Sequence, residues 1–286
     1  MIDPMPRDNP ADSWRTRPTN ELLKRAISGL VLAAVTITAI WFGGWLFALL
    51  IAAVCLVLAW EWGRVVRNAE LDTIYAITSV ALVAAVGLSA AGQYAGAFAA
   101  LGLGTLVVAL TRPNPGDWLS ASGVPYLGLS AVAMIWLRSG DDGGAAVLFV
   151  FACVWAHDTL AMLTGRTLGG PRLWPQVSPK KTWAGAVGGL AASALAGCLC
   201  ALFIPGASVI WMTGLGVFFG FTAFLGDLAE SALKRLGGLK NASSLIPGHG
   251  GFLDRLDGAI LSFTLAGLIA ALLNAQQPAQ ALIFGH

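Results

Sequence analysis

The stretch AISGLVLAAVTITAIWFGGWLFALLIAAVCLVLAW, from Ala26 to Trp60, contains no charged side chain. A helix needs about 20 apolar residues to cross the hydrocarbon core of a bilayer, so this run is too long for one crossing. Gly43 and Gly44 near its middle favour a turn, because glycine adopts backbone conformations that other residues avoid. The run therefore predicts two membrane-spanning helices, near residues 25–42 and 45–62.

Similar apolar runs follow along the rest of the chain. They predict seven further helices, near residues 73–90, 94–111, 118–137, 143–158, 183–204, 207–226 and 258–273. Only 11% of the 286 residues are charged and 57% are hydrophobic, whereas soluble domains carry about 25% charged residues. This composition excludes a soluble enzyme, a disordered protein and a disulfide-stapled secreted scaffold. We expect an all-α integral membrane protein with about nine transmembrane helices.

Basic residues are distributed very unevenly between the two sides of this arrangement. Nine crossings place 16 of the 17 Lys and Arg on the side of the N-terminus, and Arg138 alone on the other. Because cytoplasmic segments are enriched in Lys and Arg, the N-terminus is expected in the cytoplasm and the C-terminus outside. Three regions follow: a polar, disordered tail without a cleavable signal (1–24), N-terminal transmembrane helices (25–150), and a catalytic transmembrane region (151–286) with cytoplasmic loops 158–182 and 227–257.

Carboxylates in the second of these loops lie next to two apolar spans. If the eighth helix continues into the loop, Asp227, Glu230 and Lys234 share one face, because they are spaced by three and four residues. Asp254 and Asp257 share a face for the same reason. The aspartates Asp227, Asp254 and Asp257 would together form an oxygen site suited to Mg²⁺, which commonly shares phosphate ligands. For any single aspartate, the alternative is a helix cap at the membrane interface.

A glycine-rich turn and several basic residues accompany these carboxylates. The turn is Pro247-Gly-His249-Gly250-Gly251, where bare backbone N–H groups can approach an anion. His249 has access to substrate in such a turn, and a plain loop position is the alternative. Positive charge for phosphate groups would come from Lys234, Arg235, Lys240 and Arg255. The segment predicts a metal-dependent phosphate site at the membrane surface.

The first cytoplasmic loop adds a second candidate for anion binding. Ser178-Pro-Lys180-Lys181-Thr182 is expected to open the seventh helix, and a helix N-terminus beside lysines binds anions readily. Asp158, within a turn of the sixth span, is a further candidate because charges at membrane depth tend to mark sites. The alternatives are that the lysines only anchor the loop on the cytoplasmic side and that Ser178 and Thr182 only cap the helix.

These motifs resemble those of a known family, the membrane phosphatidate cytidylyltransferases, also called CDP-diacylglycerol synthases. The family pattern contains S-P-x-K-T-W, G-D-L-x-E, S-x-x-K-R, K-D, P-G-H-G-G and D-R-x-D. In this chain the corresponding segments are Ser178–Trp183, Gly226–Glu230, Ser231–Arg235, Lys240-Asn241, Pro247–Gly251 and Asp254–Asp257. The resemblance covers the second half of the chain, whereas the first half is similar only in its apolar spans.

The resemblance implies that CTP reacts with phosphatidate to give CDP-diacylglycerol and pyrophosphate for phospholipid biosynthesis. It implies a bacterial inner-membrane enzyme that takes phosphatidate from the cytoplasmic leaflet, with Mg²⁺ as cofactor and a monovalent cation such as K⁺ beside it. The implied cation ligands are Asp227, Asp254 and Asp257. The catalytic candidates are these aspartates with Lys234 and Arg235. The candidates for substrate binding are Ser178, Lys181, Thr182, His249, Gly250, Gly251, Arg255 and Asp158.

The chain departs from the family pattern at three positions. Asn241 replaces an Asp and lacks its charge, which argues against a direct cation ligand there. Met162 replaces a Tyr and removes a hydroxyl, and Ala184 replaces a frequent Glu. The expected partners are CTP, phosphatidate and membrane lipids, with no nucleic acid, and a homodimer stays open.

Two other functions are alternatives. A CTP-dependent polyprenol or phytol kinase would transfer the γ-phosphoryl group and release CDP, but the run H-G-G-x-x-D-R-x-D argues against it. A transporter would place polar residues at mid-span. Here the charges gather at the cytoplasmic rim, so the transporter is the remote alternative.

Overall fold

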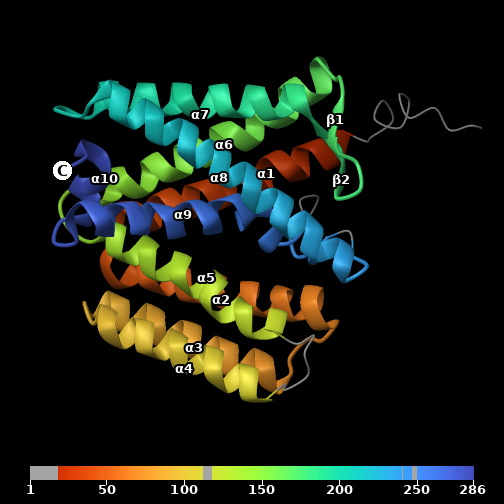
Figure 1. Cartoon of the computed structure of the whole chain (residues 1–286), viewed down its shortest axis with the longest axis vertical. Coiled ribbons are helices and arrows are strands. Elements are labelled where there is room, and N and C mark those ends of the chain that lie inside the picture. Colours follow the sequence, from red (N-terminus) through yellow and green to blue (C-terminus); the bar gives the residue numbers. More distant parts are fainter. Residues whose placement is uncertain (1–18, 112–117, 240, 247–249) are drawn as a thin grey trace, which may run out of the picture.

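The computed structural model describes residues 19–111, 118–239, 241–246 and 250–286, with side chains from residue 29 onward. Helices and one short hairpin make up this part of the chain (Figure 1). In order they are α1 (Thr19–Phe42), α2 (Gly44–Arg67), α3 (Thr73–Ala90), α4 (Tyr94–Thr111), α5 (Trp118–Arg138), α6 (Gly143–Thr167), β1 (Arg172–Trp174), β2 (Ser178–Thr182), α7 (Trp183–Phe203), α8 (Val209–Leu236), α9 (Leu253–Asn274) and α10 (Pro278–Phe284).

The helices are those of an integral membrane protein. Within the described residues, eight helices, α2 to α9, are long and apolar enough to cross a membrane, and α1 adds the shorter apolar stretch Gly29–Phe42. Large apolar side chains remain exposed on their outer faces, for example Leu110 (72%), Phe203 (83%) and Ile210 (87%). Such a surface is unfavourable in water and is solvated by lipid. The predicted all-α membrane fold is confirmed.

The predicted breaks between the early helices are also confirmed. Gly43 and Gly44 have φ angles of 62° and 51°, in the left-handed region that favours glycine, and the chain turns there from α1 into α2. Helix α6 continues through His157 and Asp158, as a full crossing requires.

Several helices are longer than predicted from the uncharged runs. Helix α1 begins at Thr19, inside the segment expected to be a disordered tail, and residues 1–18 lie outside the described part of the chain. Helix α8 continues to Leu236, and α9 begins at Leu253, so that Asp254 and Asp257 lie in its first turns. Charged residues such as Glu, Lys and Arg form helices well, so a charge marks the edge of the membrane rather than the end of a helix.

The expectation that Ser178 opens the seventh helix is wrong. Residues Ser178–Thr182 form β2, which pairs antiparallel with β1, and α7 begins at Trp183. Pro179 disfavours helical geometry at the residue before it, which explains the extended start. Thr182 is the helix cap, since its Oγ1 accepts a hydrogen bond from the Gly185 N–H at 3.1 Å.

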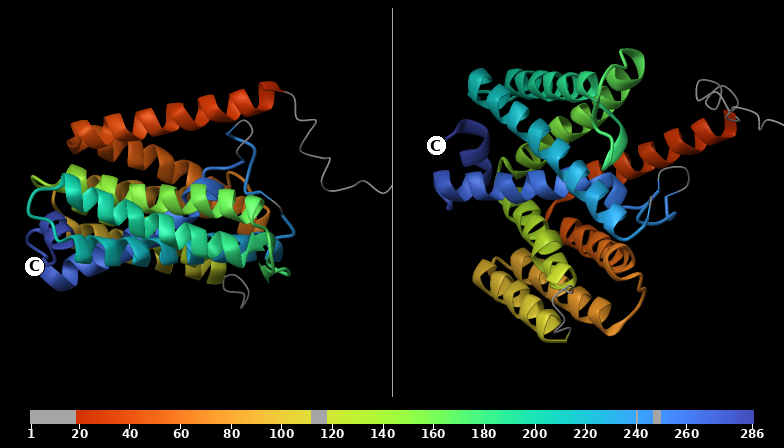
Figure 2. Two further views of the ribbon diagram at one scale, coloured as in Figure 1. Left: turned by 90° about the horizontal axis from the view of Figure 1, so that it is seen from above. Right: turned by 45° about the vertical axis from the view of Figure 1, so that its right-hand side comes forward.

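The helices pack in two groups that meet along α5 and α9. Helices α2 to α5 form one group and α6 to α10 the other, while α1 lies along the outside and packs mainly on α2 and α6 (Figure 2). The start of α1, the hairpin, the end of α8 and the start of α9 all lie at one end of the bundle, and the C-terminus lies at the other (Figure 1). Both loops that carry the candidate residues therefore share one side, and its orientation in the membrane stays a prediction.

Candidate functional site

Two glycines bring the acidic ends of α8 and α9 together. Gly226 and Gly258 lie where the helices cross, and a Cβ on Gly226 would overlap the carbonyl oxygen of Asp257. A Cβ on Gly258 would lie 3.0 Å from the Cα of Ala223. Small residues allow helix backbones to approach closely in membranes. The crossing therefore places Asp227, next to one glycine, beside Asp257, next to the other.

Three carboxylates meet at this crossing. One carboxylate oxygen from each of Asp227, Glu230 and Asp257 lies within 4.8 Å of the other two. Glu230 is 1% exposed and Asp257 6% exposed, so two of the three are shielded from solvent. The Oδ1 atom of Asp257 accepts a hydrogen bond from the Gly258 N–H at 2.7 Å. Clustered carboxylate oxygens of this kind are the donor set that Mg²⁺ prefers.

Asp254, the third aspartate predicted as a cation ligand, lies beside this cluster with protein partners of its own. Its Oδ2 accepts hydrogen bonds from the N–H groups of Ala242 (3.1 Å) and Gly251 (2.9 Å). Its Oδ1 accepts one from Lys234 Nζ at 2.5 Å, and the same ammonium forms an ion pair with Glu230. The structure thus brings together Asp227 and Asp257 of the predicted triad, with Glu230 as the third carboxylate.

Lys181 reaches the same crossing from strand β2. Its Nζ lies 2.8 Å from Asp227 Oδ2, and it also lies over the ring of Phe224, 5.4 Å from the ring centre. The Asp227 side chain is 42% exposed, whereas the Lys181 side chain is 17% exposed and its Nζ is shielded from solvent. The carboxylate side of this ion pair is therefore the more accessible one. The hairpin therefore delivers positive charge directly onto the carboxylate cluster.

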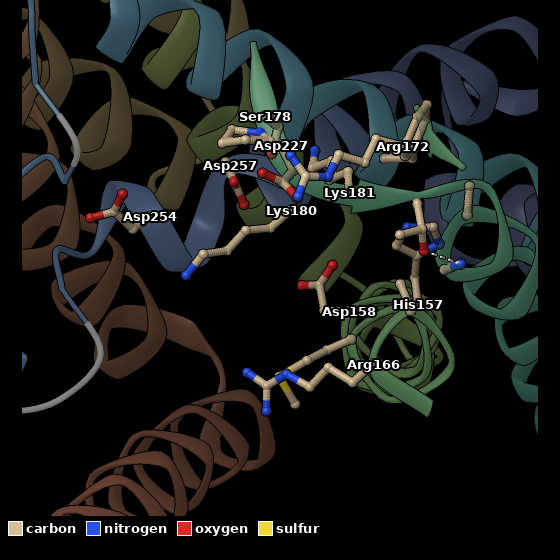
Figure 3. A pocket seen from close by; sticks show the side chains of 18 of the residues that line it. His157, Asp158, Arg166, Arg172, Ser178, Lys180, Lys181, Asp227, Asp254 and Asp257 are labelled. Carbon is tan, nitrogen blue, oxygen red and sulfur yellow. Dashed lines mark hydrogen bonds and ion pairs between the residues drawn. The ribbon is translucent and has the colours of Figure 1, made fainter. Parts of the chain in front are cut away.

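These groups, apart from Glu230, line one open cavity of about 1340 Å³ between α6, the hairpin, α8 and the start of α9. Asp158 and Arg166 of α6 project into the same space as Asp227 and Asp257 (Figure 3). The predicted residues that line it are Asp158, Ser178, Lys181, Thr182, Asp227, Lys234, Asp254, Arg255 and Asp257. The volume exceeds the range of about 300–1,000 Å³ that is usual for a small-molecule pocket. The cavity combines carboxylates for a cation with basic side chains for an anion.

Three predicted residues of the described chain do not line the cavity. Arg235 is exposed and donates to the carbonyl oxygens of Val177 and Leu239, both at 3.4 Å. Gly250 forms an isolated bridge with Ile246. Gly251 donates to Asp254. His249, like Lys240 and the start of its turn, lies outside the described residues.

The N–H groups at the end of this turn and just after it already have partners inside the protein. Gly250 donates to Ile246, Gly251 donates to Asp254, and Phe252 and Leu253 both donate to Glu61. The prediction that bare N–H groups of the turn face an incoming anion is therefore not met at Gly250 and Gly251, the two residues of the turn that the structure describes. The carboxylates of Asp254 and Glu61 accept the hydrogen bonds of the N–H groups from residue 251 to residue 253.

Glu61 was missed in the sequence as a site residue. It is fully buried in the C-terminal half of α2, yet it contacts the segment just before α9. Its one signal was that it directly follows the uncharged run from Ala26 to Trp60. Arg166, Arg172, Lys180 and Asn241 also line the cavity.

The sequence of the chain is similar to those of known cytidylyltransferases over most of its length. Residues 23–273 match the sequence model of the cytidylyltransferase family. A phosphatidate cytidylyltransferase of Brucella abortus is 33% identical over 277 residues, which cover 93% of this chain and 99% of the relative. One of Pseudomonas aeruginosa is 35% identical over 249 residues, covering 82% of this chain and 92% of the relative. One of Staphylococcus saprophyticus is 35% identical over 147 residues, covering 51% and 56%.

Proposed function

The chain belongs to the cytidylyltransferase family, and from this we propose that it transfers the cytidylyl group of CTP to phosphatidate. The products are CDP-diacylglycerol and pyrophosphate. The observation that carries the proposal is the cavity, in which a carboxylate cluster and basic side chains meet at the end of apolar helices. Relatives that cover nearly the whole chain and are named for this reaction support it.

The chemical problem is that both substrates are anions. A phosphate oxygen of phosphatidate forms a bond to the α-phosphorus of CTP, while the bond from that phosphorus to the bridging oxygen of pyrophosphate breaks. At neutral pH the lipid phosphate is already ionised, so the reaction needs positioning and charge neutralisation more than a strong base. Arg166, Arg172 and Lys180 line the cavity and are suited to neutralise phosphate charge there. Lys181 can exchange its partner Asp227 for a phosphate.

A divalent cation fits the donor set at the helix crossing. We assign Asp227, Glu230 and Asp257 as the residues that would hold Mg²⁺. Such a cation supplies charge neutralisation and polarisation of phosphoryl oxygens. Asp254 lines the same cavity beside them and stays a candidate ligand. A monovalent cation such as K⁺ also stays a prediction.

The walls of the cavity suit one lipid and one water-soluble substrate. Its lining includes the apolar side chains of Ala161, Met162 and Phe224 as well as the charged groups. Met162 is 51% exposed, on a helix long and apolar enough to span the membrane. We infer that phosphatidate enters from the cytoplasmic leaflet of a bacterial inner membrane and that CTP enters from the cytoplasm.

The test follows the two ends of CTP separately. Detergent-solubilised protein is incubated with phosphatidate, Mg²⁺ and CTP labelled in either the α- or the γ-phosphate. We expect the α-label in the lipid fraction and the γ-label in pyrophosphate. A lipid that acquires the γ-label, with release of CDP, would identify a lipid kinase instead. Folded protein that labels no lipid would refute the proposal.

A further inference from the structure

A buried carboxylate from the N-terminal helices holds the segment that leads into α9. Glu61 Oε1 accepts hydrogen bonds from Ser243 Oγ at 2.5 Å and from the Phe252 N–H at 3.0 Å, and Oε2 accepts one from the Leu253 N–H at 2.5 Å. Phe252 follows Glu61 by 191 residues in the sequence. The two ends of the segment from residue 243 to residue 253 are therefore tied to a single side chain of α2.

These contacts replace a helix cap that α9 lacks. Phe252 occupies the cap position of α9 but makes no side-chain cap hydrogen bond. The first N–H groups of a helix need external acceptors, and negative charge near a helix N-terminus is favourable. Glu61 is 0% exposed, and among the described residues no basic side chain pairs with it. Its charge is thus stabilised by the start of the very helix that carries Asp254 and Asp257.

Gly251 shows how closely Glu61 of α2 packs against the segment before α9. A Cβ added to Gly251 would overlap the carboxylate of Glu61. Gly251 does not have a positive φ angle, so the space, not the backbone conformation, requires glycine at this position. The final glycine of the turn therefore makes room for an internal carboxylate.

We propose that Glu61 is a positioning residue for the cytidylyl transfer: by capping α9 from α2, it sets where Asp254 and Asp257 stand in the cavity. The inference rests on the proposed function, because positioning is defined by its effect on that reaction. It assigns the N-terminal helices a part in the site, although none of their described side chains lines the cavity.

The test uses Glu61→Gln, which keeps the length of the side chain but presents an NH₂ group to at least one donor that needs an acceptor. We expect the Mg²⁺ concentration for half-maximal rate to rise about tenfold, as for partners that orient metal ligands. We also expect faster hydrogen exchange in peptides that cover residues 250–256. A thermal unfolding transition in detergent, compared with that of the wild type, tests whether the variant is folded.

Two further variants make the result decisive. Glu70→Gln removes an exposed carboxylate that pairs with Arg64 at 2.8 Å, just beyond α2, and should leave both readouts unchanged. If Glu61→Gln does not fold, Gly251→Ala displaces the carboxylate without removing it and should change both readouts in the same direction.

Unchanged exchange at residues 250–256 in a folded variant would overturn the proposal. Faster exchange with an unchanged Mg²⁺ dependence would also overturn it, because Glu61 would then only stabilise the fold. If the wild-type protein forms no CDP-diacylglycerol, the proposed function fails on its own. The exchange experiment then still shows whether Glu61 holds the start of α9.

Discussion

Replacing Lys234 by Met should destabilise the protein strongly. The Lys234 ammonium lies between Glu230 of its own helix and Asp254 of α9, and the three side chains are 12%, 1% and 7% exposed. Met preserves most of the volume of the stem but removes the charge, so two shielded carboxylates lose their shared cation. Removing one partner of a buried ion pair costs about 3–5 kcal/mol. We expect a loss in this range, because one cation serves two carboxylates.

The free energy of unfolding can be measured by SDS titration of the detergent-solubilised protein. Lys180→Met is the matched control, because Lys180 is exposed on β2 and its replacement should change the stability by less than about 0.5 kcal/mol. The double variant Lys234→Met/Asp254→Asn should recover part of the loss, since it removes one of the two uncompensated charges. A Lys234→Met protein within about 1 kcal/mol of the wild type would refute the reasoning, because a pair that is effectively solvated contributes no more than that.

Three further predictions concern the cation, the anion and the orientation. Asp257→Asn should lower Mg²⁺-dependent formation of CDP-diacylglycerol about a thousandfold, because it removes a charged ligand from the cluster; near-wild-type initial rates at low Mg²⁺ would place the cation elsewhere. Lys181→Ala should lower kcat/KM for CTP if Lys181 neutralises phosphate charge, and an unchanged kcat/KM would confine it to its ion pair with Asp227. A reporter fused after His286 should be external, and a cytoplasmic signal would contradict the count of nine crossings.

The membrane helices could be predicted from the sequence because one property decides them. Lipid excludes charge and unpaired backbone groups, so each long uncharged run must be a helix. The ends of α8 and α9 could not be predicted in this way, since the helices continue where the charges begin. The hairpin of β1 and β2 was missed because both strands are short and carry no alternating apolar pattern, and β2 itself contains a proline and two lysines.

Most residues of the candidate site could be predicted from the sequence, but which carboxylates lie next to each other could not. Spacing along one helix showed that Asp227 shares a face with Glu230, and that Asp254 shares one with Asp257. Which of these carboxylates meet across two helices depends on how α8 and α9 cross at Gly226 and Gly258. The spacing of residues within one helix gives no information about that crossing.

The contact of Glu61 with the start of α9 could not be predicted from the sequence for a related reason. It joins residues 191 positions apart in the sequence. Local patterns carry no information about such a pair, and the turn before α9 was therefore interpreted as open to an external anion.

Two lysines that carry the same charge in the sequence differ in what they can do in the fold. Lys181 pairs with one carboxylate, that of Asp227, whose side chain is 42% exposed. When Lys181 leaves Asp227 for a phosphate, the carboxylate that it leaves behind is open to solvent. Lys234 is held between two shielded carboxylates, and moving it would leave both of them unpaired. Lys181 is consequently the lysine suited to bind a phosphate of the substrate. Lys234 is the lysine suited to hold α8 and α9 in fixed positions during the reaction.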